Sequence, residues 1–354
     1  EMASARGPYY SALDADTEGV EGSTYLWTPD EVHAVLNPAD AEAFCSAYGI
    51  TREGNFENTG KSNPVLQTAD IAIRNALASA RELLLASRQK RPQPARDNKL
   101  LTAWNALLAQ GLSRAAFTFD RPDWLLSARR ICDWIWAAMR HNENQLWAVS
   151  YGRDGRENGK LDDYAYSAAA FLSLAAVVDW QYPGESAFWL TRAIALTDAI
   201  NRHFKDPAGP GYYYVSDDHE ILVHRKKDWF DNATPSGNSV MVHVLSTLEA
   251  LTGESRYASL LYELKSVYPA ITTAAPGATS HALEGFVHQA VGIPVIKYRM
   301  GANLESLRQD LATRPWRPVY ILPADKGQSA NFQLCVGTQC LEPTDSVKEV
   351  AEML

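Results

Sequence analysis

Apolar residues recur at helical spacing in three pairs of segments along the middle of the chain. In each pair a polar cluster precedes a helix rich in Ala, Ser and Gly, and a short loop leads into a second helix that runs back. The pairs extend over about 102–141, 163–204 and 234–268, which indicates an irregular repeat of helical hairpins. Because small residues let helices approach closely, we expect the first helix of each pair in an inner ring and the second, half-solvated helix outside it.

The pattern differs on either side of these hairpins. Further helices are predicted at about 29–36, 39–48, 69–91 and 281–292, and Thr28-Pro29-Asp30-Glu31 is typical of a helix start with a capping box. Beyond residue 292 the pattern favours strands at 294–299, 318–322 and 332–336, with helices at 304–312 and 347–353. We therefore predict a mainly α fold, with a helical-hairpin domain over 1–292 and a small α/β subdomain over 293–354.

The composition excludes several classes of protein. With 46% hydrophobic and 21% charged residues the chain is typical of a globular protein. Its net charge of -9 argues against a nucleic-acid partner. The sequence shows neither a run of 18 apolar residues nor a leader pattern, so we expect a cytoplasmic protein with no membrane partner. Cys335 and Cys340 could form a disulfide across a turn, but two ordinary buried thiols are the favoured interpretation.

Acidic residues near the start of the chain suggest chemistry. Asp14, Asp16 and Glu18 alternate, so an extended chain would project them to one side, where crowding raises the pKa of at least one carboxyl. Carboxyls of unequal pKa are what glycoside chemistry requires. The alternatives are a solvated acidic loop and a cation-binding loop.

Four further polar clusters, three of them before the predicted inner helices, carry amides, carboxylates or aromatic faces that could bind sugar hydroxyls and CH surfaces. These clusters are Gly54–Glu57, Arg96–Lys99 with Thr102–Asn105, Asp162-Asp163-Tyr164, and Thr234–Asn238. For the last three clusters the alternative is a helix start whose polar residues only satisfy backbone N–H groups.

Histidines form a separate candidate cluster. His281, Glu284 and His288 share one helix face, which allows an acid/base or metal role. Since the zinc signature His-Glu-x-x-His is absent, we predict no metal and no cofactor. His243, in an apolar stretch, is interpreted as a core histidine.

The motifs as a set resemble a known family. Tyr10–Asp16 with Tyr25–Pro29, Gly54–Glu57, Leu101–Asn105, Leu161–Ala165 and Ala233–Ser239 resemble, in order and spacing, the family of spermatogenesis-associated protein 20 and its bacterial relatives. The resemblance implies a thioredoxin-like domain followed by an (α/α)6 toroid similar to six-hairpin glycosidases and N-acylglucosamine 2-epimerases. We expect the thioredoxin-like part and the first toroid helices to lie outside this chain, so that the toroid is incomplete unless that domain or another chain completes it.

The leading hypothesis is a carbohydrate-active protein whose cavity holds a small molecule or glycan. The catalytic candidates are Asp14, Asp16 and Asp163, with His281 added for an epimerase- or isomerase-like reaction. The candidates for binding the substrate are Tyr10, Glu18, Tyr25, Trp27, Glu57, Asp97, Lys99, Trp104, Asn105, Asp162, Tyr164, Ser236 and Asn238. The alternative is a non-catalytic glycan- or protein-binding scaffold that works with a thioredoxin-like domain, so the sequence leaves open whether the chain is an enzyme.

Overall fold

The computed structural model describes residues 1–152, 154–220, 223–314, 318–324, 327–337 and 339–354. The chain forms two compact units, which are described separately. The larger unit contains Glu1–Ser11 and Lys99–Leu354, and the smaller one contains Ala12–Asn98.

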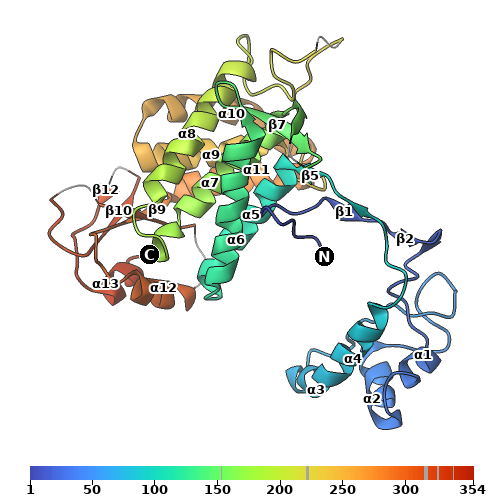
Figure 1. The fold of residues 1–354 in the computed structure, drawn as a ribbon. Coiled ribbons are helices and arrows are strands. Elements are labelled where there is room, and N and C mark those ends of the chain that lie inside the picture. Colours follow the sequence, from blue (N-terminus) through green and yellow to red (C-terminus); the bar gives the residue numbers. More distant parts are fainter. Residues whose placement is uncertain (153, 221–222, 315–317, 325–326, 338) are drawn as a thin grey trace. The chain divides into compact units, whose positions relative to one another are not determined.

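Helical hairpins make up most of the larger unit (Figure 1). The helices are α5 (Thr102–Thr118), α6 (Pro122–Trp134), α7 (Leu161–Ala175), α8 (Ser186–His203), α9 (Gly237–Thr252), α10 (Ser255–Ala274) and α11 (Ser280–Val291). Helices α5, α7, α9 and α11 lie side by side in that order, and α6, α8 and α10 each pack on the preceding helix of their hairpin. The predicted mainly α fold, with inner and outer helices as in an (α/α) toroid, is confirmed.

Helix α7 shows why small residues select the inner position. Nearly all of its side chains are buried, among them Ala165, Ala168 and Ala170, so neighbouring helices contact it on several sides. By length and composition the segment Leu161–Trp180 could also cross a membrane, but 89% of the window is buried inside this fold. Its burial is that of a core helix.

A small sheet lies at the start of the first two hairpins. Strand β7 (Gln145–Ser150) pairs antiparallel with β5 (Leu100–Leu101), β6 (Arg140–His141) and β8 (Gly155–Asn158). A π-helical turn, η1 (Ile135–Met139), connects α6 to β6. Because β5 leads directly into α5, and β8 ends three residues before α7, this sheet fixes where both helices begin.

The last part of the chain forms the predicted α/β structure. Its elements are β9 (Pro294–Tyr298), α12 (Leu304–Ala312), β10 (Tyr320–Pro323), β11 (Phe332–Val336), β12 (Gln339–Cys340) and α13 (Val347–Glu352). The strand order is β10-β9-β11-β12, with β10 parallel and β11 antiparallel to β9. A disulfide joins Cys335 to Cys340, so the favoured interpretation of two separate thiols is wrong.

This sheet shares its core with the hairpins. Strand β10 contacts α7 and α8, and α12 contacts α5. The hydroxyl of Tyr298 on β9 donates to Asp179 Oδ2 at 2.9 Å, and Asp179 Oδ1 accepts the N–H of Ser186 at the start of α8. Asp179 lies in the short helix η2 (Val178–Trp180) between α7 and α8. The α/β structure therefore belongs to the same compact unit as the hairpins, and the expected division at residue 292 stays a prediction.

The smaller unit has a core of its own, built around Trp27, Val32, Phe44 and Leu84. Its elements are β1 (Ala12–Leu13), β2 (Asp16–Thr17), β3 (Val20–Glu21), α1 (Pro29–His33), α2 (Pro38–Tyr48), α3 (Ile71–Ala76), α4 (Ala78–Arg88) and β4 (Arg96–Asp97). The predicted capping box is present, since Thr28 Oγ1 accepts from Glu31 N and Glu31 Oε2 accepts from Thr28 N. The helix predicted over 69–91 is interrupted at Leu77.

Candidate functional site

Asp163, a predicted catalytic residue, connects the starts of two inner helices. Its Oδ1 accepts the N–H of Ala103 at 3.0 Å, and its Oδ2 accepts the N–H of Lys160 at 2.8 Å. Burial raises the pKa of Asp163 to about 7. Both carboxylate oxygens therefore accept hydrogen bonds from backbone N–H groups that would have no partner within a helix at its start. The structure supports a positioning role, and a catalytic role stays a prediction.

Two predicted sugar-binding amides are engaged in the same way. Asn105 accepts from Tyr9 N at 2.7 Å and donates to the carbonyl oxygens of Tyr9 and Leu101. Asn238 accepts from Tyr212 N at 2.9 Å and donates to the carbonyl oxygens of Tyr212 and Asp228. Each amide therefore holds a loop against the start of an inner helix. Their roles toward a ligand stay predictions.

Asp162 differs from its neighbour. Its Oδ1 is buried, and within the described part of the chain no hydrogen bond to this atom is found. Burial raises the pKa of Asp162 to about 6, and the nearby Asp228 carboxylate adds to the increase. A Cβ placed on Gly237 would lie 2.6 Å from Leu161 Cγ and 2.9 Å from Asp162 Oδ1. The glycine that starts α9 thus permits close packing against α7.

The remaining predicted residues of the larger unit have varied surroundings. Trp104 on α5 is half exposed, at 51%, and its indole is accessible for stacking. Tyr164 is buried, and its hydroxyl oxygen accepts from Leu146 N. Ser236 is the N-cap of α9. Tyr10 and Lys99, both half-buried, also belong to this unit.

The other predicted residues belong to the smaller unit: Asp14, Asp16, Glu18, Tyr25, Trp27, Glu57 and Asp97. The chain reverses at Glu18 and Gly19, which have φ of 55° and 79°, so the three acids do not follow one extended strand as expected. All three are exposed. Trp27 is 5% exposed and lies beneath the Arg91 guanidinium at 4.0 Å, so its ring belongs to the core.

A polar cavity of about 50 Å³ lies among the four inner helices. Its polar lining includes Gln110 and Arg114 from α5, Ser173 from α7, His243 and Thr247 from α9, His281 and His288 from α11, and Tyr320 from β10. All four inner helices contribute, which makes this the point where the hairpin architecture brings together groups from distant parts of the chain.

The imidazoles in this cavity form a connected group. The rings of His243 and His281 stack with centroids 4.1 Å apart, and the ring of His288 lies edge-on to His243 at 5.8 Å. His243 Nε2 lies 2.7 Å from the carbonyl oxygen of His281, so this nitrogen is the donor and Nδ1 carries the lone pair of the neutral ring. Burial, followed by the charge of His281, lowers the pKa of His243, which favours the neutral ring.

Glu284 lies within ion-pair distance of His281. Its Oε2 lies 3.6 Å from His281 Nδ1, and the interaction with that imidazole lowers the pKa of Glu284, which is therefore ionised. Possible ligand atoms of His243, His281 and Glu284 all lie within 4.8 Å of one another. However, the stacked rings and the His243 N–H that serves a carbonyl favour a hydrogen-bonded network over a metal centre. The absence of a metal stays a prediction.

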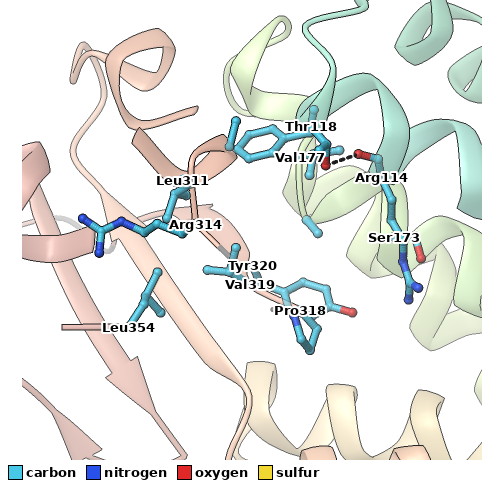
Figure 2. Close-up of a pocket in the computed structure, with 13 residues that line it drawn as sticks. Arg114, Thr118, Ser173, Val177, Leu311, Arg314, Pro318, Val319, Tyr320 and Leu354 are labelled. Atoms are coloured by element: carbon cyan, nitrogen blue, oxygen red, sulfur yellow. Dashed lines mark hydrogen bonds between the residues drawn. The ribbon is translucent and has the colours of Figure 1, made fainter. Parts of the chain in front are cut away.

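A larger, mainly apolar chamber of about 220 Å³ adjoins the polar cavity. The two share Arg114, Ser173, Pro318 and Tyr320. Figure 2 shows Arg114 and Ser173 on the hairpin helices, facing Pro318 and Tyr320 across the chamber. The polar cavity alone has room for a few waters or one small polar group, so a sugar would extend into this chamber.

The sequence indicated only part of this site. Helical spacing places His281, Glu284 and His288 on one helix face, whereas the apolar surroundings of His243 favour a core histidine and no local motif indicates Gln110 or Arg114. The signal for Gln110, Arg114 and His243 is a polar or charged residue in an inner helix that otherwise consists mainly of small, apolar residues.

Comparisons with known proteins give sequence relatives and partial structural neighbours. No family model matches the chain. Human spermatogenesis-associated protein 20 is 28% identical over 298 residues, covering 70% of this chain and 36% of that protein, and the rat protein is 29% identical over 294 residues with the same coverage. The chain thus spans just over a third of the length of these relatives.

The structural neighbours include a D-mannose isomerase (14% identity, TM-score 0.42, 75% of this chain and 65% of that one). Another is the family 76 glycoside hydrolase of Bacteroides thetaiotaomicron (10% identity, TM-score 0.40, 74% and 65%). A third is the cellobiose 2-epimerase of Spirochaeta thermophila (19% identity, TM-score 0.38, 48% and 43%). Over 70% of its length this chain is similar to spermatogenesis-associated protein 20, and the family resemblance of its motifs is confirmed.

Proposed function

We propose that the larger unit binds a sugar between its inner helices and moves a proton on it, as an epimerase- or isomerase-like enzyme does. The observation that carries this proposal is the pair of His243 and His281, which line the polar cavity, with Glu284 close to both of them. A base oriented by a carboxylate is a recurring catalytic arrangement, and Glu284 Oε2, 3.6 Å from His281 Nδ1, would take that role. The neutral His243 offers a second imidazole with a free lone pair.

The chemistry follows from these groups. In an open-chain aldose the proton on C2 is acidified by the neighbouring carbonyl, and a neutral imidazole can remove it. Return of a proton to the opposite face of C2 gives an epimer, whereas return to C1 with transfer of the hydroxyl proton gives a ketose. Under this proposal Arg114, Gln110 and Tyr320, which line the same space, would bind sugar oxygens.

The test is to incubate the protein with a panel of reducing sugars in D₂O and to follow deuterium at C2 by NMR. We expect exchange by the wild-type protein and a loss of at least about 100-fold on His281→Gln. His203→Gln is the matched control, because His203 pairs with Asp217 and is not among the residues that line the cavity. If the folded wild-type protein exchanges no sugar proton, the catalytic proposal fails and a binding scaffold becomes the better hypothesis.

A second candidate, glycoside hydrolysis, is favoured by Asp162. Burial raises its pKa to about 6, and the Asp228 carboxyl group lies nearby, so the two form the kind of carboxyl pair that this reaction uses. Release of the aryl alcohol from aryl glycosides, lost in Asp162→Asn, would support hydrolysis over epimerisation. We also propose that the protein is cytoplasmic. We further propose that a partner completes the ring of helices.

A further inference from the structure

The cysteines of the C-terminal sheet lie directly opposite each other at its edge. Cys335 on β11 pairs with Cys340 on β12, and the next pair is Val336 with Gln339. Leu341 N donates to Leu334 O at 2.8 Å, so the pair next to the cysteines is a hydrogen-bonded one. Because the two kinds of pair alternate along an antiparallel ladder, Cys335 and Cys340 form a non-hydrogen-bonded pair. At such a position opposed residues are closest, and here the Cα atoms are 3.9 Å apart.

The two sulfurs differ in their access to solvent. Cys335 is 4% exposed, on a strand paired on both sides, whereas Cys340 is exposed on a two-residue edge strand. In thiol–disulfide exchange a thiolate attacks one sulfur of the disulfide, approaching it in line with the S–S bond. Access therefore selects Cys340 Sγ as the atom that is attacked.

The position of the disulfide argues against a mainly stabilising role. The cysteines are five residues apart, and the hairpin already pairs them through its backbone. A cross-link that closes so short a loop restrains the unfolded chain less than a long-range one does. Its removal should therefore leave most of the fold intact.

The hairpin also contacts the end of the helix that carries the cavity histidines. A Cβ on Gly292 would lie 2.5 Å from Val336 Cγ1, so Val336 packs directly over this glycine. Gly292 ends α11, and its N–H donates to the carbonyl oxygen of His288 at 2.9 Å. Cys335 and Cys340 also line a cavity of about 770 Å³ between this sheet and the turn from α9 to α10.

We propose that Cys335 and Cys340 form a reversible dithiol–disulfide exchange site whose reductant is a dithiol. A thiolate of the reductant attacks Cys340 Sγ, the bond to Cys335 breaks, and the Cys335 thiolate takes a proton. The second thiol of the reductant then attacks its own sulfur in the mixed disulfide, and Cys340 leaves as a thiolate that is protonated. Two electrons pass to the protein, and the reductant leaves as a disulfide. This exchange does not depend on the sugar chemistry proposed above.

Reduction removes the covalent link between the edge strand and β11 next to Val336. We expect the hairpin and the last turn of α11 to exchange amide hydrogens faster in the reduced protein, while the middle of α7, which is buried, does not change.

The experiment equilibrates the intact, folded chain in buffers of graded dithiothreitol ratio, followed by alkylation and peptide mass spectrometry. We expect Cys335 and Cys340 to gain two alkyl groups together while circular dichroism still reports the folded helices. Cys45 and Cys132, which are not in the disulfide, serve as internal controls whose labelling should not follow the buffer ratio. A pair that stays oxidised until the helices unfold would overturn the proposal.

Glutathione tests which sulfur is attacked. The mixed disulfide trapped on the wild-type protein should lie on Cys340. In single variants, the remaining thiol of Cys335→Ser should react at least about 10-fold faster than that of Cys340→Ser, because only Cys340 is exposed. Equal rates, or a mixed disulfide on Cys335, would refute the assignment. The double variant Cys335→Ser/Cys340→Ser should keep its helical circular dichroism signal. Its amide hydrogens should exchange as fast as those of the reduced wild-type protein if loss of the disulfide itself causes the change.

Discussion

Replacement of Asp163 by Ala tests whether this residue holds the inner helices together. Asp163 is 6% exposed, and its carboxylate accepts hydrogen bonds from the backbone N–H groups of Ala103 and Lys160. Without it, two donors at the helix starts lose their acceptor. An unsatisfied buried donor costs about 1–3 kcal/mol. Because burial has already raised the pKa of Asp163 to about 7, part of this contribution is offset by desolvation. We expect the free energy of unfolding to fall by about 2–4 kcal/mol.

Asp162→Ala is the matched control, one residue away in the same helical turn. Its buried Oδ1 has no hydrogen bond that the described residues supply, so its removal should change the free energy of unfolding by less than about 1 kcal/mol, or increase it. Urea unfolding at pH 7.5, followed by tryptophan fluorescence, measures both variants. Equal losses in the two variants would refute the reasoning. If Asp163→Ala remained as stable as the wild type but lost sugar turnover, the catalytic prediction for Asp163 would be favoured instead.

Two further changes test packing and pH dependence. Gly285→Ala places a methyl group 2.8 Å from Val242 Cγ1 and 3.0 Å from His243 Cδ2, so it should cost about 1–3 kcal/mol in urea unfolding. Gly111→Ala, a helical site with open space around its Cβ, should instead gain up to about 1 kcal/mol, and a loss there as large as at Gly285 would contradict this argument. The folded-state pKa of Asp162, about 6, lies above its unfolded value of about 3.9, so the folded protein binds more protons between these values. Its stability should therefore fall as pH rises from about 4 to about 6, and Asp162→Asn should reduce that slope; identical slopes would show that this carboxyl titrates normally.

Most helices and strands can be predicted from the local sequence pattern. Helical spacing of apolar residues located the hairpins, small residues marked the inner helices, and the Thr28–Glu31 capping box marked a helix start that the structure reproduces. The strands and helices of the C-terminal part were also predicted within a few residues. These features depend on interactions between helix residues three or four positions apart, or on side chains that alternate between the two faces of a strand. Both can be read from a short stretch of sequence.

The contacts between polar groups from distant segments depend on the tertiary fold. Asp163, Asn105 and Asn238 were indicated by residue type, but the backbone partners that occupy them come from other segments of the chain. His243 contacts His281 across 38 positions because α9 and α11 pack against each other at Gly285, where no Cβ intervenes. The acids at the start of the chain fall in a separate compact unit. Local pattern specifies which face of a helix is buried, whereas the partner of that face depends on how all the helices fill one core.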